Sequence, residues 1–319
     1  MQRSLVGSEM CIRDRSWEVC EMDIPILSLL ILIPLIGAIA TLFMGGERQK
    51  YAKYVAGVFA AITLILSLYV MFATEMGDLS ESYTWIETST ITINFALAVD
   101  GLSILMVFLT ALLTLLVIVF SAEEKDRPNY FHTLVMAMEV GLMGVYLAAD
   151  YFLFYVMWEI TLIPMYFMIS WYGGPRRHYA AIKFLIYTHV ASLVMLIGIF
   201  AMGFESMGMN GGVIDFSFEN INALMPQTSE AFQAIVFVLL FFGFMVKMPS
   251  VPFHTWLPDA HVEAPTGGSV LLAGVMLKMG SYGIIRVCLE CFPAGAEHWQ
   301  WVIIAIGLIS MVYGAYACI

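Results

Sequence analysis

The chain has 319 residues, of which 61% are hydrophobic and only 12% are charged, and its mean hydropathy is +0.86. Soluble domains contain about 25% charged residues, so this composition excludes a soluble globular protein and indicates a chain embedded in a lipid bilayer. The formal net charge of −11 comes mostly from acids in loops. Since no basic patch accompanies them, no nucleic-acid partner is expected.

The first 21 residues differ from the rest. They are mixed in charge and lack the apolar core of a signal peptide, and SLVGSEMCIRD is similar to translated sequencing-adapter sequence. We interpret residues 1–21 as a non-native extension and Met22 as the natural start. Cys288 and Cys291 form a Cys-x-x-Cys pair without a second pair or nearby histidines, so apolar packing rather than a metal site is expected.

Nine stretches are long and apolar enough to cross a membrane as helices, which makes the predicted fold an all-α polytopic transmembrane bundle. The runs are continuously apolar, without the alternation of outer-membrane strands. The expected spans are 24–43, 51–74, 101–121, 131–149, 151–171, 180–203, 231–247, 264–288 and 299–318.

Lysine and arginine occur in alternate loops, which predicts the orientation of the bundle. The loops after the first, third and fifth spans contain Arg48, Lys50, Lys53, Lys125, Arg127, Arg176, Arg177 and Lys183. The loops 75–100, 204–230 and 289–298 contain none. By the positive-inside rule the N-terminus is expected on the outer face of the membrane.

Two connecting segments are unusual. Residues 84–100 alternate and are rich in β-formers, which favours either a small hairpin on the outer face or an ordered loop. The segment from Lys247 to Pro265 contains Pro249, Pro252 and Pro258. Prolines interrupt helical hydrogen bonding, so this segment is either a broken seventh helix beside protein or water, or an ordinary cytoplasmic loop.

Three charged residues are expected inside the membrane: Glu159 near the middle of the fifth span, Lys247 at the end of the seventh and Lys278 halfway along the eighth. A charge at the bilayer centre costs at least about 2.5 kcal/mol, so such residues are usually functional. A structural ion pair is the alternative. Snorkelling to the interface is expected instead for Arg286 and Lys183, which lie near helix ends.

A carboxylate, two lysines and histidines along apolar helices are suited to proton transfer. Burial favours the neutral forms and pairing favours the charged forms, so a loosening contact between Glu159 and Lys247 would release a proton. His254 and His261 are either relay groups or hydrogen-bond donors to backbone carbonyls freed by the break, and His189 is a further relay candidate. Glu139 is either a relay group or a residue near a wet interface.

Two segments resemble a known family. YFLFYVMWEITLIPMYFMISWYGG and GFMVKMPSVPFHTWLPDAHVEAPTGGSVLLAGVMLKMGSYGIIR are similar to the antiporter-like subunits of respiratory complex I, the proton-translocating NADH:quinone oxidoreductase. The resemblance is to chain M, the bacterial relative of mitochondrial subunit four, and covers residues 22–319. It implies a location in the inner (plasma) membrane of a bacterium. It implies that Glu159, Lys247 and Lys278 translocate protons, that His254 and His261 match family histidines near the break, and that Glu123 matches a carboxylate before the fourth helix.

The resemblance also implies a domain organisation. Residues 22–127 would hold the first three helices, 128–291 the first five-helix repeat (helices four to eight) with its broken seventh helix, and 292–319 the start of a second repeat that the chain does not complete, as in a C-terminally truncated fragment. The enzyme would be a translocase without a redox centre in this chain, with NADH, FMN, iron–sulfur clusters and quinone bound by partner membrane-arm and other subunits. The alternatives are an ion-translocating subunit of a multi-subunit Na⁺/H⁺ antiporter or membrane-bound hydrogenase, and a scaffold.

Overall fold

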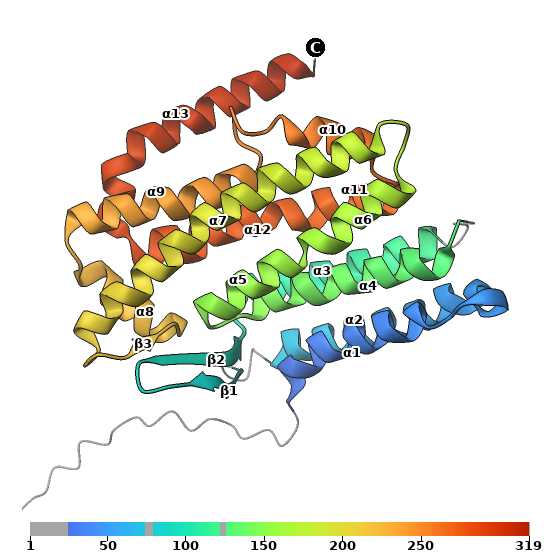
Figure 1. Cartoon of the computed structure of the whole chain (residues 1–319), viewed down its shortest axis with the longest axis horizontal. Coiled ribbons are helices and arrows are strands. Elements are labelled where there is room, and N and C mark those ends of the chain that lie inside the picture. Colours follow the sequence, from blue (N-terminus) through green and yellow to red (C-terminus); the bar gives the residue numbers. More distant parts are fainter. Residues whose placement is uncertain (1–24, 74–78, 122–125, 319) are drawn as a thin grey trace, which may run out of the picture.

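The computed structural model describes residues 25–73, 79–121 and 126–318. The two predictions that concern residues 1–21 and Glu123 therefore lie outside the described residues. The described chain is a bundle of long, roughly aligned helices, with a small β-sheet at one end and the helix break partway along its length (Figure 1). Eight of its helices are long and apolar enough to span a membrane, and α1, of 17 residues, is a ninth apolar helix. The predicted all-α membrane bundle is confirmed.

The N-terminal part consists of three helices and a hairpin. Its elements are α1 (Ile26–Leu42), η1 (Gly46–Tyr51), α2 (Ala52–Ala73), β1 (Ser80–Glu87), β2 (Ile91–Ala98) and α3 (Gly101–Phe120). Asp100 begins α3 because its side chain accepts hydrogen bonds from the Leu102 and Ser103 backbone N–H groups, while the Ser103 side chain returns a bond to the Asp100 N–H. This capping box fixes the end of α3 against the hairpin.

The predicted hairpin is present, and it pairs further. β1 and β2 are antiparallel, with Tyr83 opposite Phe95, and a bulge lies between Thr84 and Ile86. β3 (Ile214–Asp215) pairs with β2 in parallel, which completes the sheet order β1-β2-β3. Sequence reasoning missed β3, because a two-residue strand has no periodicity of its own.

The middle of the chain forms the core. Its elements are α4 (Pro128–Leu147), α5 (Tyr151–Ile160), α6 (Leu162–Tyr172), α7 (Arg177–Met209), α8 (Phe218–Leu224) and η3 (Met225–Gln227). α4 is buried along most of its length between α1, α3, α5 and α6. The predicted fifth span is interrupted at Thr161, where α5 passes into α6, and the predicted span 180–203 is longer at both ends as α7.

The last part contains the break. Its elements are α9 (Glu230–Lys247), α10 (Trp256–Glu263), α11 (Thr266–Leu271), η4 (Leu272–Met276), α12 (Leu277–Gly283), η5 (Ile284–Leu289) and α13 (Pro293–Ala317). η4 and η5 are π-helical turns within the eighth span, which runs from Thr266 to Leu289. α13 begins six residues before the predicted 299 and packs on α9 and η5, with only Gly295 buried.

Candidate functional site

The helix break was predicted from its prolines, and the structure shows it at the end of α9. α9 stops at Lys247, the segment 248–255 contains Pro249 and Pro252, and a new helix begins at Trp256. The Trp256 indole Nε1 donates a hydrogen bond to the Val246 carbonyl oxygen at 3.0 Å, which satisfies one group freed by the break. Pro258 lies in the first turn of α10 rather than at the break, because a proline there displaces no helical hydrogen bond.

Lys247 is the most unusual side chain at this place. It is 1% exposed, and its ammonium Nζ has no hydrogen-bond partner among the described residues. The ammonium lies 5.4 Å from the centre of the Trp158 ring and 5.9 Å from that of Phe184. Cation–π attraction to two rings stabilises the charge by about 1 to 2 kcal/mol, less than full desolvation of a lysine costs. A buried ammonium held so weakly is suited to exchanging its proton.

Glu159 follows Trp158 near the end of α5. Its Oε2 lies 2.8 Å from Nδ1 of His189 on α7, and its Oε1 is buried without a hydrogen-bond partner. The expected direct contact between Glu159 and Lys247 is wrong: among the described residues the carboxylate pairs with His189, and the ammonium faces aromatic rings. The structure thus brings Glu159 and His189 into direct contact and places Lys247 beside the residue that precedes Glu159.

Lys278 lies on α12 between the two π-helical turns. Its side chain is exposed in this chain, and Nζ donates a hydrogen bond to the Ala273 carbonyl oxygen in η4. π-helical turns free carbonyl groups and are frequent at functional sites. Two residues further along, Gly280 allows α12 to approach α9, since a Cβ there would lie 2.6 Å from the Phe244 carbonyl oxygen. The position of Lys278 relative to the end of α9 therefore depends on a glycine contact.

The remaining predicted relay groups are scattered. Glu139, in α4, is fully buried with neither oxygen hydrogen-bonded among the described residues, surroundings that differ from a wet interface. The centre of the His254 ring lies 4.7 Å from the centre of the Tyr313 ring, and His254 Nδ1 is buried without a hydrogen-bond partner among the described residues. His261, in α10, is half-buried, and this burial lowers its pKa. Neither histidine is brought into contact with Lys247.

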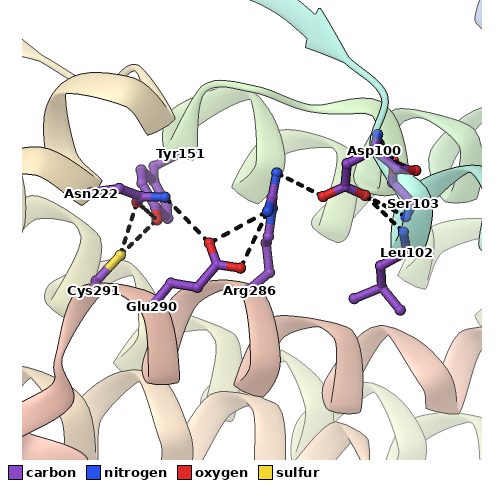
Figure 2. Close-up of polar contacts among 8 residues, drawn as sticks. All are labelled: Asp100, Leu102, Ser103, Tyr151, Asn222, Arg286, Glu290 and Cys291. Carbon is purple, nitrogen blue, oxygen red and sulfur yellow. Dashed lines mark hydrogen bonds and ion pairs between the residues drawn. The ribbon is translucent and has the colours of Figure 1, made fainter. Parts of the chain in front are cut away.

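The two residues expected to snorkel, Lys183 and Arg286, form ion pairs. Lys183 Nζ lies 2.7 Å from Oδ2 of Asp259 in α10, and Arg286 pairs with Asp100 at 2.9 Å and Glu290 at 3.2 Å. Asp259 and Asp100 are distant in the sequence from the residues they pair with, whereas Glu290 follows Arg286 by four residues. Figure 2 shows Arg286 between the carboxylates of Asp100 and Glu290. Sequence reasoning also missed that the rings of Trp158 and Phe184 face the Lys247 ammonium. The adjacency of Trp158 to Glu159 was the only available signal.

These features define a polytopic helical membrane protein with ionisable groups inside the bundle, beside a broken helix. The chain belongs to the family described as NADH:quinone oxidoreductase/Mrp antiporter, transmembrane, whose model matches residues 148–319. A second model, described as the N-terminus of chain 5 of NADH-ubiquinone oxidoreductase (complex I), matches residues 85–123. The family resemblance inferred from the sequence is confirmed.

Individual relatives are similar over almost the whole chain. NADH-quinone oxidoreductase subunit M of Pseudomonas aeruginosa is 39% identical over 91% of this chain and 60% of its own length. F(420)H(2) dehydrogenase subunit M of Methanosarcina mazei is 37% identical over 92% of this chain and 59% of its own. NAD(P)H-quinone oxidoreductase chain 4 1 of Nostoc is 36% identical over 92% and 54%. The chain thus spans little more than half the length of these relatives.

Solved structures show the same fold. A chain of respiratory complex I from Thermus thermophilus with bound NADH superposes with a TM-score of 0.79 and 28% identity, over 91% of this chain and 58% of that one. A chain of an archaeal membrane-bound sulfane sulfur reductase superposes with a TM-score of 0.72 at 22% identity, over 84% and 42%, which supports the fold alone.

Proposed function

We propose that this chain is a proton-translocating membrane-arm subunit of an NADH:quinone oxidoreductase. Relatives named as subunit M or chain 4 of such enzymes support this proposal. In this assignment NADH, FMN, iron–sulfur clusters and quinone are bound by partner subunits, and this chain contributes no redox centre. Its partners are the neighbouring membrane-arm subunits and the lipid bilayer.

The observation that supports proton transfer best is the environment of Lys247. A lysine that is only 1% exposed and whose ammonium has no hydrogen-bond partner among the described residues is costly in its charged form, so its proton is readily lost or gained when a nearby charge changes. Glu159 directly follows Trp158 in the chain, and its Oε2 lies within hydrogen-bonding distance, 2.8 Å, of Nδ1 of His189. Moving a proton between Glu159 and His189 changes the charge beside Trp158, and the Trp158 ring also faces Lys247.

The path that we propose runs from the Glu159–His189 pair through Lys247 to Lys278. The helical structure of α9 ends at the break between Lys247 and Trp256, and non-helical backbone at membrane depth can line a site for water near the ammonium. Lys278, whose Nζ donates a hydrogen bond to the Ala273 carbonyl oxygen, would receive the proton on the exposed face of α12. Among the described residues no hydrogen bond or ion pair joins the side chains of His254, His261 or Glu139 to this path, so they would act through water.

The test is to place Glu159→Gln and Lys247→Ala in the assembled complex and to measure proton pumping against electron transfer. Both variants are expected to lose pumping, while Lys50→Ala, in the exposed η1, serves as a matched lysine control that pumps normally. Normal pumping in Glu159→Gln and Lys247→Ala would refute the proposed roles and favour a scaffold. Sodium-dependent pumping would favour the antiporter class that the family description also names.

We also propose that the chain lies in a bacterial plasma membrane with its N-terminus on the outer face. The α1–α2 and α6–α7 connections, which contain Arg48, Lys50, Arg176 and Arg177, lie at the same end of the bundle as α10 (Figure 1). Basic residues gathered at one end favour the cytoplasmic side. A cysteine introduced by Gly45→Cys, in the open α1–α2 connection, should be labelled by an impermeant maleimide only from the cytoplasmic side.

A further inference from the structure

One backbone group of the helix break is held by α13. The N–H of Val251, in the segment 248–255, donates a hydrogen bond of 3.0 Å to the Ser310 hydroxyl oxygen. Three residues further along α13, the Tyr313 ring lies edge-on to the ring of His254, with 4.7 Å between the ring centres. α13 therefore contacts the break at two places, through a hydrogen bond and through a ring contact.

α13 reaches the break with a narrow stripe of side chains. From Trp299 onward its half-buried residues are Trp299, Ile303, Ile306 and Ser310, spaced three or four apart as on one face of a helix. The residues between them are exposed. Of these four, Ser310 alone has a side chain that can accept a hydrogen bond from the backbone of the break.

Close packing does not fill the space beside this part of the break. A cavity of about 220 Å³ lies between the break, the eighth span and α13, and its lining includes Met248, Ser250, Ser281 and Gly307. Side chains that line an open space lack contacts on one side, so packing fixes them less tightly there. The hydrogen bond to Ser310 therefore constrains a segment that has room to move.

The break is tied in turn to the last turn of α9. The Ser250 N–H donates a hydrogen bond to the Met245 carbonyl oxygen at 3.1 Å. The Trp256 indole donates one to the Val246 carbonyl oxygen at 3.0 Å. Both acceptors directly precede Lys247, whose ammonium faces two aromatic rings. A shift of the break would therefore move the turn that carries Lys247 relative to those rings.

We propose that Ser310 is a positioning residue for proton transfer at Lys247. By accepting the Val251 N–H, it holds the break, and with it the end of α9, in the arrangement that the proton path uses. A backbone N–H inside a bilayer has to find an acceptor within the protein, so loss of the hydroxyl would favour other arrangements of the break. This inference rests on the proposed proton transfer through Lys247.

The first test measures amide hydrogen exchange of the segment 248–255 in the assembled complex by mass spectrometry. Ser310→Ala removes the acceptor, and because alanine is the better helix former, α13 itself is not weakened. The exchange rate of the Val251 amide is expected to rise about tenfold. Ser310→Thr keeps the hydroxyl and should exchange like the unmodified complex. Ser281→Ala is the matched control, because the Ser281 hydroxyl lines the same cavity but donates within its own helix, to the Lys278 carbonyl oxygen at 3.0 Å.

The second test measures proton pumping against electron transfer in the same three variants. Ser310→Ala is expected to pump fewer protons per electron with electron transfer retained, whereas Ser310→Thr and Ser281→Ala pump normally. Unchanged exchange in Ser310→Ala, normal pumping despite faster exchange, or equal losses in Ser310→Ala and Ser310→Thr would each overturn the positioning role. Normal pumping in Glu159→Gln and Lys247→Ala would instead overturn the proposed function, whatever Ser310 does.

Discussion

Replacing Lys247 by methionine should stabilise the fold while it removes function. Lys247 is buried without a hydrogen-bond partner, and methionine has nearly the same length and shape without the charge. A lysine at mid-membrane depth costs about 3 kcal/mol, and cation–π contacts with Trp158 and Phe184 offset about 1.5 kcal/mol. The free energy of unfolding of Lys247→Met is therefore expected to rise by about 1 to 2 kcal/mol.

Lys183→Met is the matched control, because the same substitution there breaks an ion pair. Lys183 Nζ and Asp259 Oδ2 are 2.7 Å apart, and both side chains are about one-fifth exposed. Solvent screening limits the value of such a pair, so the expected loss is about 1 kcal/mol. The two lysine substitutions should change stability in opposite directions.

The assay is thermal unfolding of the purified chain in detergent, followed by a fluorogenic maleimide. Cys288 and Cys291 are buried free thiols and react only when the bundle opens, whereas the exposed Cys318 reacts at once and sets the baseline. Lys247→Met should shift the transition upward and Lys183→Met downward. A lower transition for Lys247→Met than for Lys183→Met would mean that the Lys247 ammonium is stabilised by its surroundings, and would refute the reasoning.

Three further predictions concern packing, pH and thiol reactivity. Gly280→Ala should lower the free energy of unfolding by about 1 to 3 kcal/mol in the same thermal assay, since its Cβ would lie 2.6 Å from the Phe244 carbonyl oxygen of α9. Gly57→Ala should not, since its Cβ would make only an ordinary contact, 3.9 Å, with the Ile118 side chain. Burial raises the pKa of the Asp150 carboxyl to about 6. The stability contributed by the protonated carboxyl is therefore fully present below about pH 4, and about 3 kcal/mol of it is lost as the pH rises through 6. When unfolding is measured as a function of pH, Asp150→Asn should lack this loss. Burial also raises the pKa of the Cys291 thiol to about 12, and native protein at pH 8 should therefore be labelled at Cys318 but not at Cys291, as peptide mass mapping would show.

Sequence patterns were sufficient to predict the helices and the break. Twenty-residue apolar runs have one stable form in lipid, and prolines end a helix wherever they occur in its interior, so both features are local. The same reasoning placed Glu159, Lys247 and Lys278 along their helices. It missed the interruption at Thr161 and the π-helical turns around Lys278, because no residue pattern there distinguishes them from a regular helix.

The sequence by itself determined the class of protein, the positions of its charged residues along their helices and the end of the bundle at which basic residues gather. Only the tertiary structure decided partners: His189 for Glu159, aromatic rings for Lys247, and Asp100 with Glu290 for Arg286. The physical reason is that hydropathy fixes how far along a helix a residue lies but not the direction it faces. Helix rotation is set by packing against segments that are far away in the sequence.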